Sequence, residues 1–328
     1  MTRALLALRI HRFEAVALGL LAVAALAFAG GLWLRLQAFG VPLSCFLSSH
    51  SGDGLDSGCA GRAEYNDYLG LAGDLGMYAV IALAILPLLL GLIAGVAVVA
   101  KELERGTVAL AWSISPSRRQ WLLGVVGPAI VAVVGVSVVA GLLADRLELA
   151  RDPAVDPATS LHHLGLRGAV LPAYALAAFG IALAVGAQLG RILPALLLAG
   201  SMTLGGVLGT TAIVDAMLRS EHITVDESAM LEVRAFATGR VFDSLIRTPE
   251  GELISWLEAE ARYGNTLWEE ADPGNPDYSP TAGYRFAYLV VPGQLYPIAE
   301  WRMAVTLAAL GLSGIVLAFA IVERRRPG

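Results

Sequence analysis

The 328-residue chain has little charge, a single lysine and two cysteines, and these shortages exclude whole classes of protein. Charged residues make up 16 % of it, against about 25 % in a typical soluble domain, whereas hydrophobic residues make up 56 %. The only lysine, Lys101, lies between Ala100 and Glu102, so the sequence contains no Gly-x-x-x-x-Gly-Lys-Ser/Thr phosphate-binding loop. Neither a Gly-x-Ser-x-Gly elbow nor a His-Glu-x-x-His motif occurs. We therefore predict no catalytic residue, no metal site and no cofactor in this chain.

Long apolar runs replace the missing charge. Each of six runs is close to the roughly 20 residues that a helix needs to cross a bilayer, and none carries an ionisable residue in its middle. Backbone groups in lipid must be satisfied within the segment, so these runs are expected to be helices. The fold class is thus an all-α integral membrane protein with six transmembrane helices. The six runs are 15–34, 77–100, 121–144, 168–189, 192–214 and 303–322.

The basic residues that flank these runs predict the orientation of the chain. With both termini in the cytoplasm, the inner segments hold 11 arginines and lysines and the short outer segments hold 5. This imbalance follows the positive-inside rule. Because Arg3, Arg9 and Arg12 precede the first run, the alternative for that run is a secretory signal peptide.

Both cysteines fall in the loop that this orientation places outside. Cys45 and Cys59 lie 14 residues apart in a segment rich in Ser, Gly and Asp. Two cysteines in one exported loop predict a disulfide, which would stabilise by about 3 kcal/mol in the chain-entropy model. The alternative is a metal or redox pair that includes His50, but that site lacks ligands. His162 and His163, in the next outer loop, are expected to be solvated.

The largest segment outside the six runs is 218–300. It carries 14 acidic residues and 6 arginines, and it contains too many aromatic side chains for a disordered linker. The sequence 250–262, EGELISWLEAEAR, places Leu253, Trp256 and Leu257 on one face at helical spacing. We therefore expect an external cap, mainly helical, that covers the outer mouth of the protein or else gates release or receives a partner.

Small and hydroxyl residues mark two of the six runs. Gly91 and Gly95 form a Gly-x-x-x-Gly pair in the second run, a spacing that lets helix backbones approach closely. We interpret this set as a translocation path or dimer packing surface, with packing inside the chain as the alternative. The corresponding residues of the fifth run are Ser201, Thr203, Gly205, Gly209 and Thr210.

The most informative segment is 101–120, KELERGTVALAWSISPSRRQ, between the second and third runs. Its charged start, its Leu-Ala-Trp centre and its Ser-Arg-Arg end resemble the first cytoplasmic loop of actinobacterial-like type-2 (ABC-2) ABC transporter permeases. The order of six spans, with a larger external loop before the last, resembles the same family. The resemblance implies a coupling helix in this loop that docks on a separate ATPase.

Roles in this coupling loop follow from residue type. Glu102, Glu104 and Arg105 are expected to form an exposed charged face, and Gly106 and Thr107 a turn. An apolar stripe would contain Leu103, Leu110 and Ile114, and Pro116 would end the helix. The alternative is an interfacial helix without a partner, held at the membrane by Arg118 and Arg119.

The resemblance implies the membrane-spanning permease subunit of an ATP-driven exporter, moving an apolar or amphipathic substrate. Its partners would be an ABC ATPase subunit that holds ATP and Mg, a second permease copy or paralogue, and the lipid bilayer, but no nucleic acid. The expected location is a bacterial cell membrane. The alternatives are a non-transport scaffold or sensor with a binding cap, and a membrane-embedded enzyme.

Three regions divide the chain. Residues 1–217 hold helices 1–5, with the disulfide-bearing external loop 35–76 and the coupling loop 101–120. Residues 218–300 form the external cap, and residues 301–328 form helix 6 and a basic cytoplasmic tail.

Overall fold

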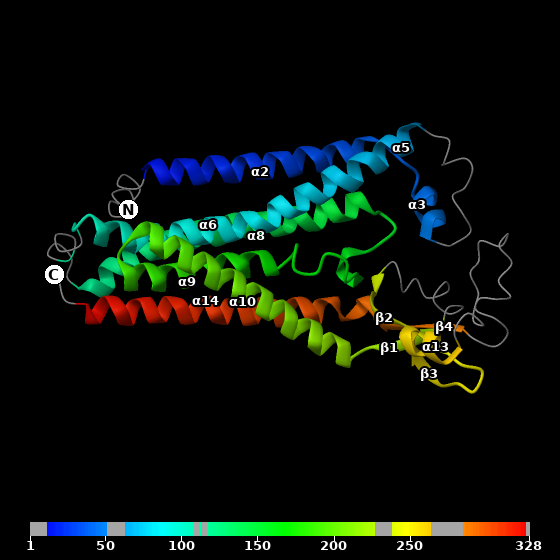
Figure 1. The fold of residues 1–328 in the computed structure, drawn as a ribbon. Helices are drawn as coiled ribbons and strands as arrows, with labels where there is room; N and C mark the ends of the chain where they lie inside the picture. The colour runs from blue at the N-terminus through cyan, green and yellow to red at the C-terminus, as the bar shows by residue number, and fades with distance from the viewer. Residues whose placement is uncertain are drawn as a thin grey trace.

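The computed structural model describes residues 12–50, 63–107, 112, 117–226, 238–263 and 285–325, and most of them form a bundle of six long helices (Figure 1). Each helix contains a stretch long and apolar enough to cross a membrane, so the predicted six-helix membrane architecture is confirmed. The helices are α2 (Arg12–Ala38), α6 (Gly76–Glu104), α8 (Arg118–Arg151), α9 (Val170–Leu189), α10 (Ile192–Ser220) and α14 (Tyr296–Arg324).

The bundle has two distinct ends. At one end α6, α9 and α14 finish and α2, α8 and α10 begin, and we call this the terminal end (Figure 1). At the opposite end a small β-sheet connects α10 to α14, and we call this the sheet end (Figure 1). Sequence reasoning places the terminal end in the cytoplasm, and this orientation stays a prediction.

Helix α9 forms the centre of the bundle and packs most extensively against α14 and α6. Glycines make these contacts close. A Cβ on Gly180 would lie 1.9 Å from the Gly311 carbonyl oxygen, and a Cβ on Gly311 would lie 2.3 Å from the Leu176 carbonyl oxygen. Backbone-to-backbone packing of this kind is typical of membrane helices. In lipid the hydrophobic effect does not drive helix association, and close packing through small residues does so instead.

Much of the predicted external loop 35–76 is helical. Helices α3 (Leu43–His50) and α5 (Ala63–Gly70) lie in it, and a π-helical turn (Leu71–Leu75) joins α5 to α6 in one 42-residue helix. Aromatic packing explains the extension, because Phe46 meets the Tyr65 and Tyr68 rings edge-on at 5.9 and 5.1 Å.

The expectation of a mainly helical cap is wrong for the described residues. They form a four-stranded antiparallel sheet in the order β1-β4-β2-β3 with one short helix, α13 (Trp256–Tyr263). The predicted helical face of 250–262 fails at its start because Leu253–Ser255 pair with β2 instead. The strands are β1 (Ile223–Asp226), β2 (Arg240–Arg247), β3 (Leu253–Ser255) and β4 (Arg285–Val291).

The link between α8 and α9 is fixed by buried charge at the sheet end. Arg167 is 2 % exposed, donates to the carbonyl oxygens of Pro157 and Ser160 at 2.6 Å, and lies 4.1 Å from the centre of the Tyr296 ring. The expectation that His163 is solvated is wrong, because its Nδ1 lies 2.7 Å from Glu148 Oε1 and its ring is half-buried.

Candidate functional site

The first half of the coupling loop continues the second spanning helix. Lys101 and Glu102 belong to the last turn of α6, which ends at Glu104. The chain then turns at Arg105–Thr107, where Gly106 adopts a φ of +70° that favours glycine. Thr107 Oγ1 donates to Glu102 Oε2 at 2.5 Å, so the turn is closed by one of the predicted docking residues.

The predicted loop residues do not share one exposed face. Glu104, Arg105, Gly106 and Thr107 are exposed, whereas Glu102 is half-buried and Lys101 is buried. Leu103 points inward and packs against the apolar cluster that includes Val98, Leu122 and Val322. Leu110 and the centre of the predicted coupling helix lie outside the described residues.

Arg118 connects the loop to the last helix. It lies in the first turn of α8, behind the N-cap Ser117, which accepts a hydrogen bond from Gln120 N at 3.2 Å. The Arg118 guanidinium lies 4.3 Å from the centre of the Trp112 ring and donates to the carbonyl oxygens of Glu323, at 3.3 Å, and Arg325. A cation at the C-terminus of α14 is favourable because unpaired carbonyls and the helix dipole concentrate negative charge there. Its neighbour Arg119 is exposed.

Arg325 makes the same kind of contact one helix further on. Its Nη1 donates to the carbonyl oxygens of Ala187 and of Gln188, the latter at 3.4 Å, at the C-terminus of α9. Gly190 ends α9 in the left-handed conformation with φ +65°, and a Cβ there would lie 2.9 Å from Arg325 Nη2. The missing side chain of Gly190 therefore makes room for the guanidinium.

Glu104 connects the end of α6 to the start of α10. Its Oε2 accepts a hydrogen bond from the Ile192 backbone amide at 2.9 Å. The N-terminus of a helix has unpaired amides and a positive dipole end, so a carboxylate placed there is stabilising. The predicted docking residue Glu104 thus also holds the fifth spanning helix.

Together these bonds form a network at the terminal end, which we call the helix-end ring. It passes from Trp112 and Arg118 to the end of α14, from Arg325 to the end of α9, and from Glu104 to the start of α10. Five of the six long helices take part in it. Charged side chains bonded to helix ends therefore connect α8 with α14, α14 with α9, and α6 with α10 at the terminal end.

Gly91 and Gly95 pack inside the chain. A Cβ on Gly91 would lie 2.4 Å from the Ala175 carbonyl oxygen, and one on Gly95 would lie 2.6 Å from the Phe179 carbonyl oxygen. Both glycines therefore serve the contact between α6 and α9. The structure assigns them the packing role that the sequence left as the alternative.

The small residues of α10 are divided between two faces. Thr203 and Thr210 are buried, whereas Ser201, Gly205 and Gly209 are exposed. A Cβ on Gly205 or Gly209 would meet no atom within 4 Å among the described residues. These two glycines therefore leave an open surface on α10, available to lipid, to substrate or to a second chain.

The structure describes only one of the two cysteines of the predicted disulfide. Cys45 lies in α3, is 1 % exposed and belongs to the apolar cluster with Phe46 and Tyr65. Cys59 lies outside the described residues, so the disulfide stays a prediction. Among the described residues, no group of three or more His, Cys, Asp or Glu side chains could hold a metal ion.

Sequence reasoning missed the contribution of Arg325 and the capping contact of Glu104. The basic tail after the last span, which contains Arg325, contributes to the sequence prediction only through the orientation of the chain. The sequence does contain a signal for these contacts. Gly190 ends α9 and Ile192 begins α10, so this short link has unpaired carbonyls on one side and unpaired amides on the other. Charged side chains can cap both sets of groups.

Comparison with known proteins supplies the family. A family model described as "ABC-2 membrane transporter related" matches residues 20–219, which is more than half of the chain. No curated protein and no solved structure matches the chain. The matched region contains α6, α8, α9 and α10 and most of the helix-end ring. The chain therefore belongs to the ABC-2 membrane transporter related family.

Proposed function

We propose that this chain is the membrane-spanning permease subunit of an ATP-driven ABC exporter whose ATPase is a separate chain. The family is one of membrane transporters, and the sequence holds no phosphate-binding loop of its own. ATP and Mg are therefore expected on the partner ATPase. The observation that carries the proposal is the helix-end ring, because it connects the coupling segment to helices on both sides of the bundle.

The ring supplies a route for coupling. The ATPase would dock on the exposed face at Glu104–Thr107 and on the segment that follows it. Movement of that segment pulls α8 and α14 through Arg118 and pulls α10 through Glu104. Because α10 carries the open glycine surface, its displacement would alter the translocation path or the contact with a second permease copy.

The substrate class follows from the composition of the membrane-spanning helices. None of the six apolar runs carries an ionisable residue in its middle, so these runs offer no chain of ionisable groups for a proton or metal ion. An apolar or amphipathic substrate fits such a path. The proposed location is a bacterial cell membrane, with both termini and the terminal end in the cytoplasm and the sheet outside.

The test is retention of an ATPase by the purified chain. Arg105→Glu reverses an exposed charge that makes no hydrogen bond or ion pair with another described side chain, and Glu102→Lys with Glu104→Lys reverses the two acidic side chains at the end of α6. Both variants should lose most of a co-purifying P-loop ATPase and its ATP hydrolysis, while Arg35→Glu, exposed at the sheet end, should retain both. If both terminal-end variants keep the ATPase at the wild-type level, this surface is not the docking site. If the wild-type chain co-purifies with no P-loop protein, the scaffold or sensor alternative is favoured instead.

A further inference from the structure

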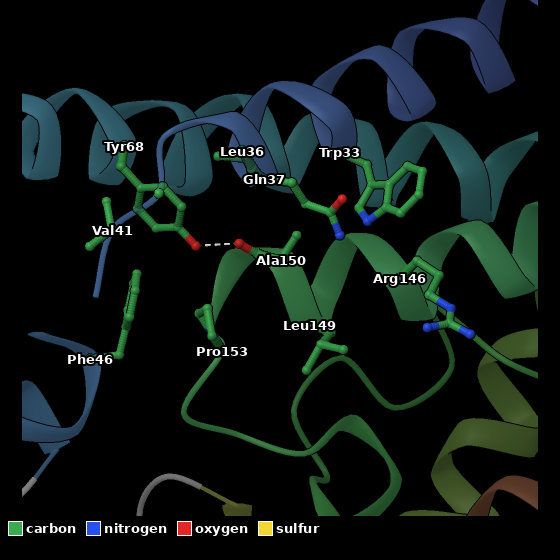
Figure 2. Close-up of a pocket in the computed structure, with 11 residues that line it drawn as sticks. Trp33, Leu36, Gln37, Val41, Phe46, Tyr68, Arg146, Leu149, Ala150 and Pro153 are labelled. Carbon is green, nitrogen blue, oxygen red and sulfur yellow. Dashed lines mark hydrogen bonds between the residues drawn. The ribbon is translucent and has the colours of Figure 1, made fainter. Parts of the chain in front are cut away.

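A pocket of about 440 Å³ opens at the sheet end between the last turns of α2 and of α8 (Figure 2). Trp33 and Gln37 of α2 line it on one side, and Arg146 and Leu149 of α8 line it on the other. The pocket lies far from the helix-end ring, and neither the family match nor the proposed coupling route gives it a role.

Its polar groups are hydrogen-bond donors that the protein leaves uncommitted. The Trp33 indole, the Gln37 amide and the Arg146 guanidinium make no hydrogen bond or ion pair with any residue that the structure describes. By contrast, the Tyr68 hydroxyl at the opposite wall donates to the Ala150 carbonyl oxygen (Figure 2). The free donors therefore lie on both the α2 and the α8 walls, toward the end of the pocket away from Tyr68 (Figure 2).

The acidic neighbours of Arg146 bind other side chains. Asp145 Oδ1 lies 3.3 Å from Arg167 Nη1, and Glu148 binds both Arg151 at 2.9 Å and His163 at 2.7 Å. Arg146 attracts Asp145 at longer range but forms no ion pair with it. Its guanidinium thus presents a forked set of donors of the kind that binds phosphate oxygens.

An apolar track leads from the pocket along α8. Val139, Leu142, Arg146 and Leu149 follow one another at spacings of three and four residues, so they share one helix face. All four are exposed, with Val139 at 51 %, Leu142 at 63 % and Leu149 at 41 %. On the N-terminal side of Arg146, this face lies in the membrane-spanning part of α8, where it would contact lipid acyl chains.

The depth of the pocket in the membrane fits a lipid headgroup. Trp33 is near the end of the apolar stretch of α2, and tryptophan is enriched where the bilayer meets water. Arg146 is near the end of the apolar stretch of α8, at the corresponding level. A molecule that satisfies both walls has an anionic head at this level and a hydrocarbon tail that points toward the bilayer centre.

We propose that this pocket binds one phospholipid with an anionic headgroup from the leaflet at the sheet end. Its phosphate accepts hydrogen bonds from Arg146, Gln37 and Trp33, and one acyl chain lies along Leu142 and Val139. The bound lipid bridges α2 and α8 where they close the aromatic cluster around Tyr68. A free phosphate shares the headgroup chemistry, but it would leave the apolar track uncovered.

The test compares lipid binding by the purified full-length chain and by matched variants. Native mass spectrometry after addition of phosphatidylglycerol or phosphatidylcholine should show preferential retention of phosphatidylglycerol. Arg146→Gln should lower that retention by about fivefold or more, because it removes the charge-assisted bonds, and Arg146→Lys should restore part of it. Arg35→Gln, which removes an exposed arginine of α2 outside the pocket, should leave it unchanged.

Three results would overturn the proposal. Equal retention of the two lipids would show that the headgroup charge is not recognised. Equal losses in Arg146→Gln and Arg35→Gln would show a general charge effect rather than a pocket. Displacement of phosphatidylglycerol by sn-glycerol 3-phosphate at equal concentration would show that the pocket recognises a soluble anion and that the apolar track contributes nothing.

Discussion

Helices α9 and α10 follow each other directly in the chain and have nearly the same mean hydropathy, 2.0 and 1.8 over their most apolar stretches, yet their surroundings are opposite. In α9 that stretch is 89 % buried within the chain, and in α10 it is 17 % buried. Hydropathy therefore identifies a helix that crosses the membrane but not what packs on it. The rest of the chain surrounds α9, whereas most of α10 is left uncovered by the residues that the structure describes.

Glycine explains much of the difference. Gly180 of α9 lets the backbone of α14 approach to contact distance, while Gly205 and Gly209 of α10 face open space. The same residue type thus closes one interface and leaves another surface uncovered. Substitutions at such glycines and at the contacts that cap the two helices should therefore affect α9 and α10 differently.

The largest effect is expected for Gly180→Ala in α9. The new Cβ would lie 1.9 Å from the Gly311 carbonyl oxygen, so α14 must move away, at a cost of about 3 kcal/mol in the free energy of unfolding. Gly209→Ala in α10 adds the same methyl group in open space and should be neutral within about 0.5 kcal/mol. Thermal unfolding in detergent measures both, and equal stability of the two variants would contradict the assignment of α9 as the packed centre.

A smaller effect is expected at the C-terminus of α9. Arg325→Ala removes the guanidinium that binds the Ala187 and Gln188 carbonyl oxygens and should cost about 1 to 2 kcal/mol. Arg324→Ala, which removes an exposed neighbour of the same charge, is the control and should change stability by less than about 0.5 kcal/mol. The same unfolding assay distinguishes them, and identical melting of the two variants would remove Arg325 from the helix-end ring.

At the N-terminus of α10 the stability effect is smaller still. Glu104→Ala removes the acceptor of the Ile192 amide at an exposed position and should cost about 0.5 to 1 kcal/mol. Glu104→Gln keeps an acceptor oxygen and should recover most of that loss. If this bond takes part in coupling, Glu104→Ala should lower ATP hydrolysis by the complex by more than its small loss of stability explains. Unchanged ATP hydrolysis in both variants would argue against coupling through this bond.

The smallest effect on the free energy of unfolding is expected for Gly205→Leu, which fills open space on α10. If two copies pair through this surface, the larger side chain holds the helices apart and the dimer fraction falls. Leu193→Ala, on another exposed part of α10, should not change that fraction. Cross-linking in native membranes measures it, and an unchanged dimer in Gly205→Leu would place the contact elsewhere.

The sequence predicted the spans well because each depends only on its own residues. A run of apolar side chains without charge is sufficient to define a membrane helix, and all six runs became helices. The helix ends were less predictable, because α8 continues to Arg151 beyond the expected end at 144 and α14 begins at Tyr296 rather than at 303. The position of Gly106 in a turn was also readable, since glycine tolerates the positive φ found there.

Features that depend on distant partners were not predictable. Strand β2 pairs with β4 across about 40 residues of intervening chain, and β3 pairs with β2 although its sequence fits a helix. His163 is half-buried because Glu148, a residue of the preceding helix, lies within 2.7 Å of its ring. The contacts of Glu104 and Arg325 with distant helix ends could not be predicted for the same reason. The sequence therefore indicated the coupling loop but not the helix-end ring.

The central claim, that an ATPase docked at the terminal end moves α10, is tested most directly by nucleotide-dependent labelling. In a chain with Cys45 and Cys59 replaced by alanine, Ser201→Cys places a thiol on the exposed face of α10, and Ala184→Cys places one on buried α9. In the complex with its ATPase, the alkylation rate of the Ser201→Cys thiol should change severalfold between the nucleotide-free and vanadate-trapped ATP states, while the Ala184→Cys thiol stays unreactive in both. A rate at Ser201→Cys that is the same in the two states would contradict the claim.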